Sequence, residues 1–323
     1  MDSHELPLCP VCSASLGSTN ERYTVGQLFA MWAPVRFSEA TVQEHREQSE
    51  VTELYRCPVC RLEIFLPQII ATPQFYVEAY NLDGSQAESD FSYSETKWDF
   101  DVALTDASGL QRVLEIGCGP GHFLDRVSPI THHVMGVESN PKALEIVRAK
   151  GYRAVGDLRE NDPLKGSFDA VFSFHVLEHV PEPLKFLRDA AEWVRPGGLV
   201  AVSLPNRAGP LRFVHPCIQD MPPHHATRWR RKTFDFVARR LGWRIQRVAF
   251  EPLTAATSYY YSMYLGPYWF PSQTRLHSLA RRTCASVFPA AFDGLFRVLR
   301  LVGRDAAPFL KGQAMYAVFR VAT

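Results

Sequence analysis

A strand that ends in three closely spaced glycines is the feature of this chain that most constrains its fold. The strand runs from Val113 to Ile116, and Gly117, Gly119 and Gly121 follow it. Glycine has no Cβ, so the backbone can turn sharply and approach a ligand closely, and the next helix presents free N–H groups. The pattern predicts an α/β fold with a nucleotide-like ligand at this strand end. The third glycine comes one residue too early for a G-x-G-x-x-G loop, which disfavours a dinucleotide pyrophosphate.

The residues after this loop predict further strands that alternate with helices. Glu138 ends the first of these strands, and a carboxylate about 20 residues after the glycine loop binds a ribose diol in sheets of this kind. Asp157 follows the next strand, and Phe174 ends an apolar run that suits a buried parallel strand. The expected strands cover residues 133–138, 152–155, 167–174, 199–204, 244–250 and 314–321.

These motifs resemble those of the class I S-adenosylmethionine methyltransferases. In that family the residues matching Glu115 and the glycine loop hold the methionine end of the cofactor, and the residue matching Asp157 contacts adenine. The resemblance implies a Rossmann-like, seven-stranded methyltransferase sheet with S-adenosylmethionine as cofactor. The expected cofactor-binding residues are Glu115, Gly117, Gly119, Gly121, Glu138, Asp157 and Phe174.

Two C-P-V-C tetrapeptides define the N-terminal part of the chain. Each is a C-x-x-C knuckle that can bring two thiolates to one ion, and four thiolates make a closed, structural tetrahedral site. We therefore predict Zn²⁺ bound by Cys9, Cys12, Cys57 and Cys60. Disulfides are disfavoured in a cytoplasmic chain, and an iron-bound pair of knuckles stays open as an alternative.

The residues from Tyr55 to Cys60, with the aromatic segment 75–80, are similar to a bacterial arrangement in which a zinc ribbon precedes a class I methyltransferase. Sugar C-methyltransferases carry one version of it, in which the ribbon resembles a lid over the substrate. The His and Tyr signature of those enzymes is not recognisable in this sequence.

Histidines gather after the strand that ends at Phe174, where this superfamily faces the transferred methyl group. An imidazole titrates near neutral pH and can take a proton from an acceptor hydroxyl. We expect a base or an orienting group among these side chains. The expected catalytic residues are His175, Glu178, His179 and His225.

The same histidines are candidate ligands of a second metal ion. The spacing is similar to the E-x-x-E-H element of small-RNA terminal 2′-O-methyltransferases and polyprenyl-phenol O-methyltransferases, which hold a divalent ion next to the acceptor oxygen. A histidine replaces the first glutamate here, which favours zinc, manganese or iron over magnesium. Alternatively, these residues only fix the loop by backbone hydrogen bonds. The second site would comprise His175, Glu178, His179, His224 and His225.

Two later segments bear on the acceptor. Arg228 to Lys232 is basic and could hold phosphates, but the amphipathic helix expected over 233–241 accounts for most of the nearby charge as a solvated face. The segment 259–270 is rich in aromatic residues that could stack on sugar or aryl rings. It opens an insertion, 254–312, that we expect to form a helical cap over the acceptor pocket.

Composition is consistent with a cytoplasmic enzyme. The chain has 323 residues, 46% of them hydrophobic, and a formal net charge of +1, which argues against a dedicated nucleic-acid binder. No apolar run reaches the ~18 residues needed to span a membrane. The expected parts are a zinc-ribbon module (1–80), a linker (81–94), a methyltransferase core (95–253 and 313–323) and an aromatic, helical cap (254–312).

The expected function is O-methylation of a small hydroxylated metabolite or of a sugar-containing intermediate. Such an acceptor would bind beside the cofactor, and the protein would align acceptor, methyl group and sulfur. The alternatives are a sugar C-methyltransferase, an RNA methyltransferase and a non-catalytic protein that binds the cofactor as a scaffold.

Overall fold

The computed structural model describes residues 6–32, 35–80, 95–159, 163–209, 212, 217–252 and 312–322. By its internal contacts the chain forms two compact units. The first unit comprises Met1–Leu204, Ile218–Val248 and Tyr316–Thr323, and the second comprises Pro205–Cys217 and Ala249–Met315. The predicted linker, 81–94, and all but the last residue of the predicted cap, 254–312, lie outside the described residues.

A seven-stranded sheet confirms the predicted methyltransferase fold, with strand order β10-β11-β8-β7-β4-β5-β6. Strand β4 pairs in parallel with both β5 and β7, so the chain reverses its direction of winding there. A ligand in an open sheet of this kind binds at that reversal, beyond the carboxyl ends of the strands. The strands are β4 (Arg112–Ile116), β5 (His133–Val137), β6 (Arg153–Val155), β7 (Phe168–Phe174), β8 (Val194–Pro205), β10 (Arg244–Phe250) and β11 (Ala314–Arg320).

One boundary of the sheet differs from the prediction. The expected strand covers residues 199–204, but β8 already begins at Val194. Val194 pairs with Phe168 at the start of β7, and the register then shifts before Ala170 meets Leu199. Tertiary pairing thus extends the strand through a proline and two glycines, because the shift absorbs them as an irregularity.

Helices flank this sheet, and local signals explain their ends. Asn140 caps α6 by accepting the N–H groups of Lys142 and Ala143, and Gly242 ends α8 with a left-handed φ of 70°. Phe100 of α4 packs edge-on against Phe174 of β7, with ring centroids 4.8 Å apart. The helices are α4 (Trp98–Ala107), α5 (His122–Val127), α6 (Pro141–Ala149), α7 (Pro183–Ala191) and α8 (Arg231–Leu241).

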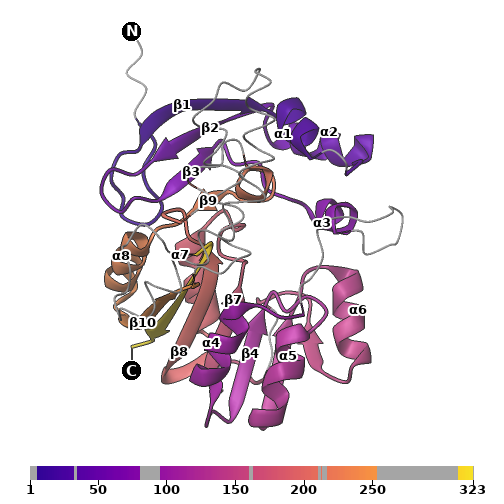
Figure 1. Ribbon diagram of the computed structural model, residues 1–323, viewed down its shortest axis with the longest axis vertical. Coiled ribbons are helices and arrows are strands. Elements are labelled where there is room, and N and C mark those ends of the chain that lie inside the picture. Colours follow the sequence, from indigo (N-terminus) through magenta and orange to yellow (C-terminus); the bar gives the residue numbers. More distant parts are fainter. Residues whose placement is uncertain are drawn as a thin grey trace, which may run out of the picture. The chain divides into compact units, whose positions relative to one another are not determined.

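The N-terminal residues build a second, four-stranded sheet with the order β1-β2-β3-β9 (Figure 1). Its first three strands are β1 (Gly17–Thr24), β2 (Val51–Arg56) and β3 (Glu63–Leu66). The fourth, β9 (Thr227–Arg228), comes from the segment between β8 and α8, far along the chain. The ribbon sheet is therefore completed by the segment that carries His224 and His225.

Three helices, α1 (Val25–Met31), α2 (Glu39–Gln48) and α3 (Pro73–Ala79), accompany the ribbon sheet. Phe75 of α3 lies among aromatic rings, stacked on Phe37 and edge-on to Trp32. This cluster is an apolar core that also includes Met221, from the segment between β8 and β9. Among the helices described, none is long and apolar enough to cross a membrane.

Candidate functional site

The glycine loop lies between β4 and α5 and has the backbone that its sequence predicts. Gly117, Gly119 and Gly121 have φ values of 75°, 52° and 86°, a region that other residues rarely adopt. A Cβ on Gly117 would lie 2.3 Å from Cγ2 of Val176, so this position also has no room for a side chain. The loop therefore passes close to the segment after β7, where the candidate catalytic residues lie.

Glu138 connects the glycine loop with the end of β5. Its carboxylate accepts the backbone N–H of Gly119 at 2.7 Å and that of Asn140 at 2.6 Å. Burial raises the pKa of Glu138, and only 7% of the residue is exposed. A carboxylate has about four acceptor positions, so these contacts leave room for a ribose hydroxyl.

Glu115 is buried on β4, and within the described part of the chain its Oε2 has no hydrogen-bond partner. Burial raises the pKa of this carboxyl group well above its usual value. A buried polar atom without a partner is uncommon in folded proteins and suits a ligand that supplies the donor. The methionine ammonium of the expected cofactor would be such a donor.

The other two predicted cofactor residues differ in their surroundings. Phe174 is buried against Phe100 and Phe123, so its ring belongs to the core at this strand end. Asp157 follows β6, and its carboxylate pairs with Arg159 at 2.6 Å. The Arg159 contacts lower the pKa of Asp157 to about 2. In this conformation an adenine amino group would share the carboxylate with the guanidinium.

His175 begins the candidate catalytic segment directly after β7, with a left-handed φ of 55°. Its Nε2 lies 3.0 Å from Oδ2 of Asp99, and its Nδ1 lies 3.4 Å from Oε1 of Glu178. Burial lowers the pKa of His175, but the two carboxylates outweigh burial and raise the pKa to about 9. The ring is therefore protonated near neutral pH, which suits an orienting or charge-balancing role better than that of a proton acceptor.

Glu178 lies at the centre of the histidines and is 1% exposed. Nε2 of His179 and Nε2 of His225 are each 3.9 Å from its Oε1. Burial raises the pKa of Glu178, but the contacts with His175 and the other imidazoles lower it by a larger amount. The pKa of Glu178 is therefore below its usual value. The site thus contains a buried carboxylate beside several ring nitrogens.

Three of the predicted histidines form a group that could hold a metal ion. The candidate ligand atoms of His179, His224 and His225 lie within 4.8 Å of one another, whereas the predicted ligands His175 and Glu178 are not members of this group. Burial lowers the pKa of His179 and lowers that of His225 well below its usual value. Neutral imidazoles have a lone pair that can accept a proton or bind a cation.

Two tyrosines that the sequence analysis did not assign to the site contact these histidines. The hydroxyl of Tyr76 lies 3.1 Å from Nδ1 of His179, and the hydroxyl of Tyr80 lies 3.2 Å from Nε2 of His224. The partners are 103 and 144 residues apart in sequence, which explains why no local motif revealed them. The aromatic residues of segment 75–80 were the only available signal.

The four cysteines of the N-terminal knuckles lie together, as predicted. Sγ of Cys9 is 3.5 Å from Sγ of Cys60, and Sγ of Cys12 is 3.3 Å from Sγ of Cys57. All four sulfur atoms lie within 4.8 Å of one another. The donor set fits one tetrahedral ion, and its closed geometry would leave no position for substrate.

Three arginines of the basic stretch contact carboxylates of the protein. Arg228 is 2% exposed, with its Nε 3.1 Å from Oδ2 of Asp220. The guanidinium of Arg230 lies 3.5 Å from the Glu63 carboxylate, and that of Arg231 lies 3.0 Å from the Asp235 carboxylate in α8. These guanidinium groups are already paired with carboxylates.

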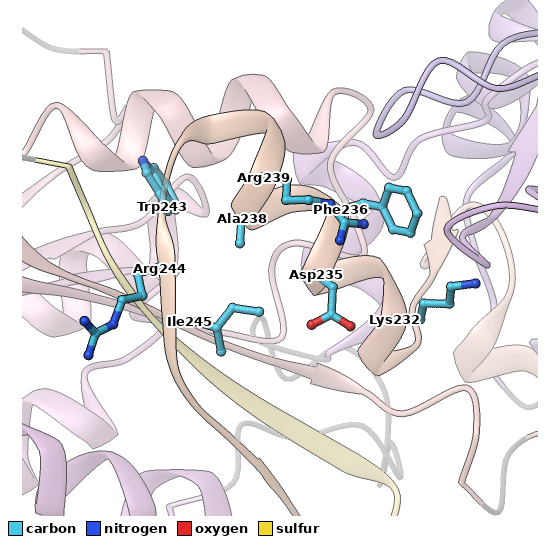
Figure 2. Close-up of a pocket in the computed structure, with 8 residues that line it drawn as sticks. All are labelled: Lys232, Asp235, Phe236, Ala238, Arg239, Trp243, Arg244 and Ile245. Carbon is cyan, nitrogen blue, oxygen red and sulfur yellow. The ribbon is translucent and has the colours of Figure 1, made fainter.

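A depression on the surface of α8 and the start of β10 is separate from this site (Figure 2). It is lined by Phe236, Arg239 and Trp243 among others, and none of the predicted site residues lines it. We therefore assign it no part in catalysis.

Comparison with known proteins agrees with this geometry. Residues 75–259 match the family described as a methyltransferase domain. The chain belongs to this methyltransferase family. The prediction of a class I, S-adenosylmethionine-dependent methyltransferase is thereby confirmed, while the roles of the individual site residues stay predictions.

Several relatives share part of this methyltransferase sequence. A ubiquinone biosynthesis O-methyltransferase of Xanthomonas campestris pv. campestris (strain B100) is 35% identical over 116 residues, which cover 33% of this chain and 46% of that protein. One from Albidiferax ferrireducens is 36% identical over 115 residues, covering 32% and 44%. The chain thus spans about half the length of the curated relatives it matches.

Among solved structures, an SAM-dependent methyltransferase from Archaeoglobus fulgidus aligns with a TM-score of 0.43 and 16% identity, covering 68% of this chain and 94% of that one. A second, from Mesorhizobium loti, aligns with a TM-score of 0.41 and 17% identity, covering 68% and 96%.

Proposed function

We propose that this methyltransferase transfers the methyl group of S-adenosylmethionine to an oxygen of a small hydroxylated metabolite or sugar-containing intermediate. The observation that carries the proposal is the group formed by His179, after β7, with His224 and His225, before β9; the pKa values of His179 and His225 are lowered by burial. A hydroxyl acceptor loses a proton during methylation, and such imidazoles can take it. The relatives named O-methyltransferases support the same acceptor atom.

The chain's own residues have three tasks in this proposal. Glu138 and the glycine loop hold the ribose and the adjacent chain of the cofactor, and the Glu115 carboxyl receives its ammonium group. S-adenosylmethionine supplies an electrophilic methyl on a sulfonium, so alignment of acceptor and sulfur accounts for much of the rate. His225 or His179 accepts the proton from the acceptor oxygen as the new O–C bond forms.

The histidines could act in a second way, as ligands of a divalent ion that holds the acceptor oxygen. Metal analysis of protein purified without a histidine tag separates the two roles. One equivalent of zinc, lost in Cys57→Ser and kept in His179→Ala, indicates the base role. A second equivalent that His179→Ala removes and Cys57→Ser keeps indicates the metal role.

Carbon is the second candidate acceptor atom, as in a sugar C-methyltransferase. The hydrogen bonds of Tyr76 to His179 and of Tyr80 to His224 favour it. An imidazole could remove a proton from a carbon next to a carbonyl, and a phenol could donate to the enolate oxygen that results.

The test is turnover of S-adenosylmethionine labelled with ¹³C in its methyl group, using panels of phenols, sugar hydroxyls and keto-sugars. NMR of the product distinguishes a methyl group on oxygen from one on carbon. Product from the hydroxyl panels supports the proposal. A carbon-bound methyl supports the second candidate, and cofactor binding without turnover on any panel favours the scaffold.

The N-terminal part is proposed as a structural zinc ribbon, with residues 1–80 as one module ahead of the core at 95–253 and 313–323. Four reduced thiols in one site are typical of the cytoplasm, where we propose that the enzyme works. The cap at 254–312 would border the acceptor.

A further inference from the structure

A carboxylate that the proposed reaction does not use lies behind one of the buried histidines. Oδ1 of Asp220 is 3.4 Å from Nδ1 of His225, and both residues are at most 5% exposed. On its other side the imidazole has Nε2 directed at Glu178, 3.9 Å away. The imidazole of His225 thus has the Asp220 carboxylate beside Nδ1 and the Glu178 carboxylate of the candidate site beside Nε2.

Asp220 is itself held by a buried arginine. Nε of Arg228 donates to the backbone oxygen of Asp220 at 2.7 Å and lies 3.1 Å from its Oδ2. The guanidinium lies over the ring of Phe65, 4.8 Å from the centroid. A guanidinium held on both sides has little freedom, so it restrains the position of the aspartate.

Arg228 in turn belongs to the ribbon sheet. It is the β9 residue that pairs with Glu63 of β3, and its NH1 lies 3.7 Å from the Glu63 carboxylate. Glu63 is fully buried and is also 2.9 Å from Arg56. A continuous line of charged groups therefore runs from the ribbon through Glu63, Arg228 and Asp220 to His225.

We infer that Asp220 is the positioning residue of His225 and that the ribbon, through Glu63 and Arg228, sets the place of Asp220. The inference rests on the proposed function. A carboxylate that accepts the Nδ1 hydrogen selects the tautomer with a bare Nε2 and fixes the orientation of the ring. The ribbon then orients the reacting imidazole.

A purely structural ion cluster would affect folding but not the tautomer of His225. Asp220→Asn keeps the shape of the side chain, but its amide can donate to Nδ1 and favour the opposite tautomer. Asp220→Glu keeps a carboxylate. The matched control is Asp235→Asn, which breaks an ion pair of α8 away from the histidines.

The first measurement is the ¹⁵N NMR spectrum of the histidine rings, with His225 assigned by its loss in His225→Gln. It needs no acceptor, so it decides the inference even if the proposed reaction fails. We expect an Nδ1–H tautomer in the parent and in Asp220→Glu, and a shift toward Nε2–H in Asp220→Asn. An unchanged His225 signal in folded Asp220→Asn overturns the inference.

The second measurement is methyl-transfer kinetics. Loss of an outer partner of a functional histidine costs about 10- to 100-fold in activity, and we expect this loss in kcat for Asp220→Asn. Acceptor KM and cofactor affinity should match those of Asp235→Asn. Glu63→Gln should also lower kcat, by a smaller factor than Asp220→Asn does. Parental kcat in both variants contradicts the inference, whereas inactivity of the parent on every acceptor contradicts the proposed function alone.

Discussion

Single carboxylates in this protein have roles that depend on their burial and their partners. Glu138 and Glu115 both have raised pKa values because they are buried, yet only Glu138 accepts backbone N–H groups. Asp157, by contrast, pairs with Arg159 and has its pKa lowered. Carboxylate side chains near the glycine loop thus differ in burial and in the direction of their pKa shifts.

Replacing Glu138 with alanine should weaken cofactor binding. Two hydrogen bonds from ribose to a charged acceptor would be lost, each worth about 1.5–3 kcal/mol, and the Gly119 N–H would lose its acceptor. We expect Kd for S-adenosylmethionine to rise at least ~10-fold by titration calorimetry. Glu145→Ala, on the exposed side of α6, is the control, and equal affinities in the two variants would refute the ribose assignment.

Glu115→Gln should make stability less dependent on pH. The pKa of Glu115 is raised in the folded state, so the folded protein binds this proton more tightly than the unfolded chain. The parent then loses stability as pH rises from the unfolded value of about 4.3 toward the folded pKa, by ~1.4 kcal/mol for each unit of displacement. In urea unfolding, the free energy of unfolding of the Gln variant should increase relative to that of the parent between pH 5 and pH 8. A constant difference over that range would show that Glu115 has an ordinary pKa.

At the scale of elements, strand β9 explains how the ribbon and the histidine segment are connected. The two residues of β9 pair with β3, and the N–H of Ala71 donates to the oxygen of Pro223 next to the histidines. The hydroxyl of Thr233 at the start of α8 donates to the backbone oxygen of Cys60 in the second knuckle. The ribbon sheet is therefore joined to the histidine segment by strand pairing and by backbone hydrogen bonds.

Cys57→Ser should release zinc and loosen the ribbon. Metal binding and local folding share one free energy in a four-thiolate site, so thermal unfolding should begin at a lower temperature. Because β9 pairs with β3, we expect kcat to fall while cofactor affinity stays within about twofold, since the glycine loop lies on other elements.

Val59→Ser is the matched control, because it changes the same tetrapeptide at an exposed position that offers no ligand. Full zinc content in Cys57→Ser would rule out ligation by all four cysteines. Loss of cofactor affinity together with zinc would show that the ribbon also supports the cofactor site.

At the scale of the whole molecule, charge argues against an extended polyanionic acceptor. The net charge is +1, and Arg228 and Arg230 are paired with buried carboxylates. Neutralising the basic stretch would therefore disturb the ribbon sheet before it disturbed any ligand.

We expect the kcat/KM of the parent enzyme to change little with salt. A protein that makes 6–10 phosphate contacts loses about 10³- to 10⁵-fold in affinity between 50 and 200 mM salt, whereas this enzyme should change by less than ~3-fold. The variant Arg231→Gln/Lys232→Gln alters exposed positions of the stretch and should leave the salt dependence unchanged. A steep slope that this variant reduces would favour RNA as the acceptor.

The sequence by itself determined the sheet, the glycine loop and the four cysteines, because each depends on local patterns such as apolar runs, glycine conformation and knuckle spacing. Only the tertiary structure brought Tyr76, Tyr80, Asp99 and Asp220 to the histidines. It also buried Arg228, which the sequence presented as part of a basic surface. Burial and pairing across more than a hundred residues are set by the packing of the whole chain, so no window of sequence carries them. For the same reason, no window of sequence could show that Asp99 and Glu178 raise the pKa of His175 or that burial lowers the pKa of His225.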